Sequence, residues 1–140
     1  MNYRFCTSPD ASLLALLNLG LIRDEGHRNP MGVAELEARM TGWLKGEYQA
    51  VLFEKEGTAA GYALFRRDPE FVMLRQFFVI PELRRQGVGR NAIDWLRANV
   101  WADAPALRVE VLFGNSAGRA FWRVMGFEDY CVTMEARPSS

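Results

Sequence analysis

The sequence lacks the features that mark secreted, disulfide-bonded and membrane-spanning proteins. Only two of its 140 residues are cysteines, Cys6 and Cys131, and the opening MNYRFCTSPD has no apolar stretch long enough for a secretion signal. We therefore expect two free thiols, small and buried, in a cytoplasmic protein. No run approaches the roughly 18 apolar residues of a membrane span, so no membrane partner is expected.

An excess of charge of either sign is also missing. Lysine plus arginine and aspartate plus glutamate number 17 each, which gives a formal net charge of zero. A non-specific nucleic-acid binder needs surplus positive charge to displace counterions, so no nucleic-acid partner is expected. With two cysteines and a single histidine, His27, nothing resembles a zinc cluster and no metal is expected. A net charge of zero still allows a local cluster of basic side chains that binds a small phosphorylated ligand.

The length and the 49% hydrophobic content predict one domain over residues 1–140 with a sizeable core. The first half reads as strands and two helices separated by a loop at Gly20–Gly32. The expected strands are Asn2–Cys6, Gln49–Phe53, Ala59–Phe65 and Phe71–Val79, and the expected helices are a segment beginning at Ser8–Pro9 and the stretch Val33–Leu44.

Strands and helices alternate in the second half. A helix is expected over Gly89–Trp101, a strand over Leu107–Leu112, a helix capped by Asn115 or Ser116 that ends at Gly126, and closing strands at Phe127–Tyr130 and Cys131–Ala136. The fold class is therefore mixed α/β (α+β). We expect a mostly antiparallel central sheet of six to seven strands, about four helices and at least one strand–helix–strand crossover.

The stretch PELRRQGVGR, residues 81–90, has the composition of an anion site. Pro81 ends the most apolar strand, and three arginines (Arg84, Arg85 and Arg90) surround Gly87 and Gly89 just before a helix. The first N–H groups of a helix have no internal partner, and a glycine lets an anion approach the main chain. Alone this pattern is weak evidence for an anion site, because a solvated basic turn has the same composition. Neither G-x-x-x-x-G-K-[ST] nor G-x-G-x-x-G is present.

Two segments together are more specific. FFVIPELRRQGVGR is similar to the acyl-CoA-binding motif of the GNAT superfamily of N-acetyltransferases, an apolar strand followed by V-x-P-x-x-R-x-x-G-x-G. About 25 residues later, NSAGRAFWRVMGFE resembles that family's N-x-x-A-x-x-F-Y-x-x-x-G-F segment. The two motifs cover residues 77–127, and the expected order of strands and helices ahead of them is compatible with the family.

The resemblance implies a sheet whose strands splay apart to admit acetyl-CoA as cosubstrate. It implies an enzyme that transfers the acetyl group to a primary amine of a small molecule or peptide by direct attack, with the backbone N–H near Val79 polarising the thioester carbonyl. The cofactor-binding residues it implies are Phe77, Phe78, Val79, Arg84, Arg85, Gln86, Gly87, Val88, Gly89, Arg90, Asn115, Phe121 and Trp122.

The sequence departs from the family pattern at the proton-transfer groups. Trp122 stands where the family often has a tyrosine acid, and an indole N–H does not act as a general acid. The strand FVMLRQFFV carries no carboxylate. His27 and Glu25 in the predicted loop and Glu110 on a strand are candidate bases, and a water chain is an alternative. The polar loop itself reads equally well as a solvated connection or as an acceptor-recognition lid.

Two further alternatives stay open at this point. The missing tyrosine and the missing strand carboxylate would also suit a non-catalytic acyl-CoA-binding sensor or interaction domain. An exposed edge strand at Cys131–Ala136 would allow two chains to pair as a homodimer.

Overall fold

Five strands form one sheet in the order β1-β2-β3-β4-β5 in the computed structural model, which describes residues 1–26 and 29–138. The first four strands pair antiparallel and β5 pairs parallel to β4. The strands are β1 Asn2–Phe5, β2 Tyr48–Lys55, β3 Thr58–Arg67, β4 Val72–Val79 and β5 Leu107–Val109. The helices are α1 Ala11–Glu25, α2 Val33–Lys45, α3 Val88–Asn99 and α4 Ser116–Val124, with short 3-10 turns at Ser8–Asp10 and Pro81–Leu83.

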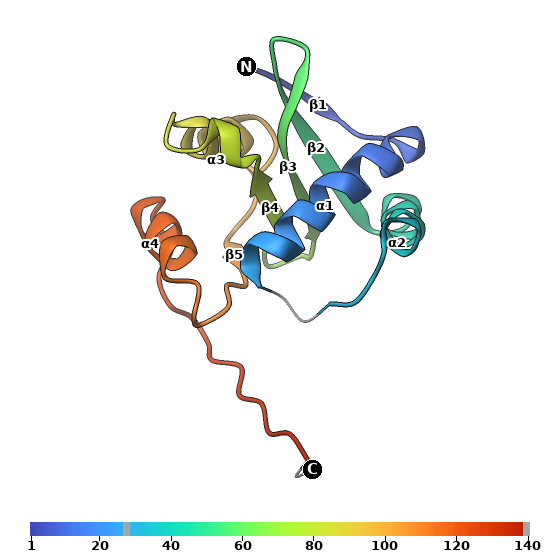
Figure 1. Cartoon of the computed structure of the whole chain (residues 1–140). Helices are drawn as coiled ribbons and strands as arrows, with labels where there is room; N and C mark the ends of the chain where they lie inside the picture. Colours follow the sequence, from blue (N-terminus) through green and yellow to red (C-terminus); the bar gives the residue numbers. More distant parts are fainter. Residues whose placement is uncertain (27–28, 139–140) are drawn as a thin grey trace.

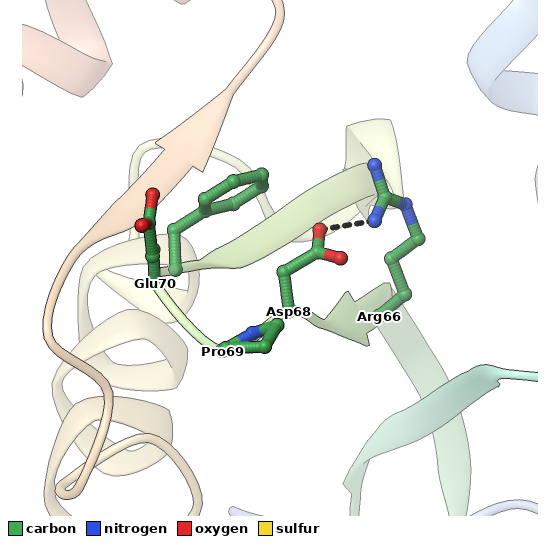
Figure 2. Close-up of a pocket in the computed structure, with 5 residues that line it drawn as sticks. Arg66, Asp68, Pro69 and Glu70 are labelled. Carbon is green, nitrogen blue, oxygen red and sulfur yellow. Dashed lines mark hydrogen bonds and ion pairs between the residues drawn. The ribbon is translucent and has the colours of Figure 1, made fainter.

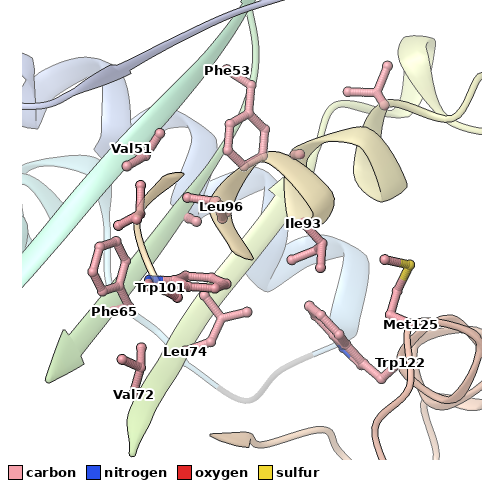
Figure 3. Close-up of a cluster of buried hydrophobic side chains, with 14 of the residues drawn as sticks. Val51, Phe53, Phe65, Val72, Leu74, Ile93, Leu96, Trp101, Trp122 and Met125 are labelled. Atoms are coloured by element: carbon pink, nitrogen blue, oxygen red, sulfur yellow. The ribbon is translucent and has the colours of Figure 1, made fainter. Parts of the chain in front are cut away.

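The helices cover the two faces of the sheet in pairs, α1 with α2 on one face and α3 with α4 on the other (Figure 1). Side chains alternate between faces along a strand, so neighbouring residues of β2, β3 and β4 feed two different cores. Figure 3 shows the core under α3 and α4, where Ile93, Leu96 and Trp122 meet Phe53 and Leu74 of the sheet. The other core packs Leu14, Met40 and Tyr62.

Helix α1 is longer than the sequence predicts, because it continues through Gly20 to Glu25 and ends at Gly26, whose φ of +62° is left-handed. The predicted loop at Gly20–Gly32 is therefore wrong for its first six residues. A glycine inside a helix costs about 1 kcal/mol relative to alanine. Here the Phe78 ring occupies the space, since a Cβ on Gly20 would lie 2.9 Å from that ring. Close packing of α1 on the sheet explains the glycine.

The predicted closing strands are wrong. The described residues form five strands, not six or seven, and residues 125–138 contain none of them. The tail extends away from the body (Figure 1), with Val132 and Met134 exposed. Strand β5 pairs over only three residues and so presents a short edge to any further strand.

Both thiols are free as predicted, but Cys131 is exposed and Cys6 is half-buried. None of the described helices is long and apolar enough to span a bilayer.

Candidate functional site

The candidate site begins where β4 extends beyond the end of its neighbour β5. Pairing between β4 and β5 ends at Leu74 and Val109, whereas β4 continues to Val79. On its other side β4 remains paired with β3 up to Val79 opposite Gly61. Residues 75–79 therefore have a partner strand on one side only.

The alternation of an antiparallel ladder fixes the direction of the main-chain groups that do not pair with β3. The Ile80 N–H donates to the Ala60 carbonyl over 2.9 Å, which makes these two residues a hydrogen-bonded pair. The neighbouring pair of Val79 and Gly61 is then non-hydrogen-bonded, so the N–H and C=O of Val79 point away from β3. They face the side that β5 leaves open, and the same alternation turns the main chain of Phe77 in that direction.

Gly61 allows β3 to approach β4 at this point. A Cβ on Gly61 would lie 2.0 Å from the Phe78 carbonyl oxygen and 3.0 Å from the Cα of Val79. Backbone atoms cannot move aside as a flexible side chain can, so only glycine fits here. The geometry of the β4 end thus depends on a residue of the adjacent strand.

The chain then turns sharply into α3. Arg85 has a φ of +61° and Gly87 a φ of +78°, so two left-handed residues flank Gln86. Gly87 is the N-cap of α3, and its carbonyl accepts the first helical hydrogen bond, from the Asn91 N–H over 2.9 Å. Among the described residues, no side chain caps the helix and no protein acceptor takes the N–H groups of residues 88–90. These donors and the helix dipole favour an anion.

The basic side chains of the turn divide into two groups. Arg85 and Arg90 are exposed. Arg84 is directed elsewhere: its Nε donates to the Val79 carbonyl over 2.9 Å, and its Nη1 forms a 2.8 Å ion pair with Asp24 at the end of α1. Arg84 therefore fixes the end of β4 rather than facing the helix start. Gln86 is similarly held, because it donates to the Glu82 carbonyl.

Aromatic rings pack between the start of α3, β4 and α4. The rings of Phe77 and Phe121 stack with centroids 5.9 Å apart, and Trp122 lies edge-on to both. A Cβ on Gly89 would lie 3.3 Å from the Phe121 ring, so this glycine admits the ring against the helix. Trp122 is 8% exposed, which agrees with a packing role.

Asn115 is the N-cap of α4, one of the two caps that the sequence predicts. Its side-chain oxygen accepts from the Gly118 N–H over 3.0 Å. A Cβ on Gly118 would lie 2.5 Å from the Asn115 amide nitrogen, so the glycine makes room for the cap.

The candidate bases are scattered. Glu25 is half-buried on the last turn of α1, and Glu110 is exposed just beyond β5. His27 lies outside the described residues. Glu25 is electrostatically linked to Tyr62, which is buried on the α1–α2 face. Burial raises the pKa of Tyr62 well above its usual range, the Arg39 guanidinium partly offsets this, and Glu25 adds to it.

A family model of acetyltransferases, described as the acetyltransferase (GNAT) family, matches residues 19–127. The chain belongs to the GNAT family. It is thus an N-acetyltransferase of that family, and the match spans both segments whose resemblance pointed to it. Comparison with curated proteins gives no match.

Solved GNAT structures share the fold at low identity. One, described as a predicted acetyltransferase with acetyl-CoA from Clostridium acetobutylicum, is 18% identical with a TM-score of 0.77, covering 97% of this chain and 95% of that one. The ribosomal-protein-alanine N-acetyltransferase of Brucella melitensis biovar Abortus 2308 is 16% identical (TM-score 0.78; 97% and 98% covered). An aminoglycoside N-acetyltransferase in complex with CoA is 16% identical (0.78; 99% and 95%). Their different acceptors leave the acceptor of this GNAT protein unidentified.

One polar pair on the α1–α2 face of the sheet has no signal in the sequence. The Tyr62 hydroxyl donates to the Gln76 side-chain oxygen over 2.7 Å, and Tyr62 is fully buried. Tyr62 pairs with Phe78 and Leu64 with Gln76, so the two side chains share a face once the register is known, but the sequence alone does not fix that register.

A pocket of about 340 Å³ lies at the β3–β4 turn, at the other end of β4 from Val79 (Figure 2). Arg66 and Asp68 form an ion pair at its mouth, and Phe71 lines it. Its residues all lie between positions 66 and 71, so it does not reach the open side of Val79. The pocket is thus separate from the open side of β4 and from the start of α3.

Proposed function

We propose that this GNAT enzyme transfers the acetyl group of acetyl-CoA to a primary amine of a small molecule or peptide by direct attack. One observation carries the proposal. The main chain of Val79 points to the side where β4 has no partner strand, and the chain from there leads directly to the uncapped start of α3. A thioester and a diphosphate of the same molecule could be held at these two places.

The diphosphate would be bound by the N–H groups of Val88, Gly89 and Arg90, with Gly87 leaving room for close approach. The exposed side chains of Arg85 and Arg90 would add charge-assisted hydrogen bonds. The left-handed φ of Arg85 is strained for a residue with a Cβ, and such strain is common at ligand-binding turns. The remaining proposed contacts come from β4 (Phe77, Phe78 and Val79), from the main chain of the β4–α3 turn (Arg84 and Gln86), whose side chains are held within the protein, and from the start and face of α4 (Asn115, Phe121 and Trp122).

The chemistry requires little beyond orientation. A neutral amine attacks the thioester carbonyl, negative charge develops on its oxygen, and the Val79 N–H stabilises that charge. The carbon–sulfur bond then breaks, and the thiolate, with a pKa of about 8.5 for simple thiols, takes a proton from water. The amine's own proton passes to Glu25, His27, Glu110 or a water chain; Glu25 is half-buried and lies close enough to Tyr62 to influence its pKa.

The exposed tail supports a second part of the proposal, a homodimer. Residues 125–138 contain no strand, yet Tyr130, Val132 and Met134 are 74%, 74% and 89% exposed. An extended segment with apolar side chains at every second position is suited to adding a strand to another copy. We also propose a reducing, cytoplasmic setting, because both thiols are free.

The test of acyl transfer is free-thiol release from acetyl-CoA with a broad panel of amines. Turnover above the no-amine background supports the proposal. Tight acetyl-CoA binding with no turnover on any amine would instead indicate a sensor or interaction domain.

A matched pair of variants tests the diphosphate site itself. Gly87→Asn and Gly87→Asp are isosteric, and both residues tolerate a left-handed backbone better than most. They differ by one negative charge beside the proposed diphosphate. We expect the Asp variant to bind acetyl-CoA about tenfold more weakly than the Asn variant, or about 1.4 kcal/mol. Equal affinities in calorimetry would contradict a diphosphate at this turn.

A further inference from the structure

Two arginines lie over one indole ring on the sheet face that α1 and α2 cover. The guanidinium carbon of Arg39, on α2, is 4.5 Å from the centroid of the Trp43 ring, and that of Arg75, on β4, is 4.9 Å from it. Arg75 also lies 5.9 Å from the Tyr48 ring. Residues of three elements thus hold two positive charges beside the same aromatic side chain.

A bulge in β4 explains why Arg75 faces this way. Gln76 pairs with Leu64 and Leu74 pairs with Phe65, so Arg75 is an extra residue without a partner on β3. Bulges re-aim side chains in this manner. Its neighbour Gln76 also faces the α1–α2 side, where it accepts from buried Tyr62. Arg75 is exposed, so its guanidinium is accessible from solvent.

Neither of these two guanidinium groups forms an ion pair with another described side chain. Within residues 1–26 and 29–138, no carboxylate oxygen lies within 4.0 Å of the Arg39 or Arg75 nitrogens. The hydrogen bond of Arg39 runs from Nη2 to the Asn18 oxygen over 3.1 Å. Its Nε is buried with no partner among the described residues, as is the Nδ2 of Asn18. Burial and, second, the charge of Arg75 lower the pKa of Arg39. Such positive charge favours an anionic partner.

We infer that Arg39 and Arg75 bind a carboxylate of the acceptor, so that the enzyme selects amines that carry one at a fixed distance. This inference rests on the proposed acyl transfer at Val79. Arg75 precedes Val79 by four positions, about 13 Å along a strand, and the arginine side chain covers part of that length. A guanidinium over an aromatic ring keeps its N–H edge for a planar carboxylate. An extended tripeptide, about 10 Å long, has a suitable amine-to-carboxylate separation.

Triglycine and triglycinamide provide a matched pair of probes, since the amide lacks only the carboxylate charge. We expect triglycine to bind the CoA-loaded enzyme at least tenfold more tightly in calorimetry, and to have a correspondingly higher kcat/KM for thiol release. Arg75→Gln should bring the two peptides within about twofold of each other. Arg66→Gln is the control, because Arg66 is paired with Asp68 at the β3–β4 turn, and it should leave the preference intact.

The outcomes separate this inference from the proposed function. Equal affinity for the two peptides, no binding of either, or a preference that survives Arg75→Gln overturns the carboxylate site. Failure to bind acetyl-CoA, or absence of thiol release with every amine in a broad panel, counts against the acyl transfer instead.

Discussion

Trp122 is held by the rings of Phe77, Phe121 and Phe127, each within 5.3 Å between centroids. An indole in this position packs in the core and cannot act as a general acid. We expect Trp122→Phe to keep the rate of thiol release within about tenfold, or about 1.4 kcal/mol, while lowering the free energy of unfolding by about 1 kcal/mol. Kinetics and urea unfolding measure the two effects. A hundredfold slower reaction at unchanged acetyl-CoA affinity would give Trp122 a catalytic role.

Cys6 and Tyr62 should make the protein sensitive to alkali. Burial raises the pKa of Cys6 from 9.0 to about 12, and burial raises that of Tyr62 well above 10.0. Both groups keep their protons longer in the folded chain, so their contribution to stability is complete below pH 9 and is lost as the pH rises above it. Urea unfolding from pH 8 to 11 should show falling stability. Cys6→Ala should flatten the part of the decline that begins near pH 9; an unchanged slope would contradict this assignment.

At the level of elements, β3 and β4 meet correctly only because residue 61 is glycine. Gly61→Ala places a Cβ 2.0 Å from the Phe78 carbonyl oxygen, so the strands must separate where Val79 is positioned. We expect a loss of about 2–3 kcal/mol in unfolding free energy and weaker acetyl-CoA binding.

Gly42→Ala is the control for this change. Gly42 lies inside α2 with nothing within 4 Å of an added Cβ, so alanine there should stabilise the protein by about 0.5–1 kcal/mol. If both alanines shift the denaturant midpoint alike, close approach of β3 and β4 is not what requires Gly61.

The elements that sequence predicted well are those with a strong period. The strand before Pro81 and helix α2 each differ from prediction by only a residue at either end. Prediction failed where tertiary contacts determine the secondary structure. Gly20 signals a break locally, yet the Phe78 ring explains its presence inside α1. The closing strands had suitable residues, but pairing depends on the length of β5, which no local pattern reveals.

The same division holds for the candidate site. The motif of the turn at residues 81–90 consists of contiguous residues, so it could be recognised from the sequence. The sequence did not reveal that the Arg84 side chain holds the Val79 carbonyl and Asp24, because Asp24 comes within reach only where α1 continues past Gly20. Arg39 and Arg75 come together only through a bulge in β4, which sequence alone does not locate.

At the level of the whole molecule, the proposed homodimer would pair two copies through their exposed tails. We expect the native protein to have the mass of a dimer in light scattering. Aspartate at both Val132 and Met134 should yield a monomer with an unchanged far-UV circular dichroism spectrum, because the side chains are exposed and their charge would oppose burial between copies. A native monomer, or a dimer that survives both substitutions, would contradict the proposed pairing.

The proposed acyl transfer requires acetyl-CoA to lie along the open side of β4 with its diphosphate at the start of α3. Backbone amide NMR during titration with acetyl-CoA tests this most directly. The account predicts that the largest shifts occur at the N–H groups of Val79, Val88, Gly89 and Arg90. Shifts concentrated in residues 66–71 around the β3–β4 turn, with these four amides unmoved, would contradict it.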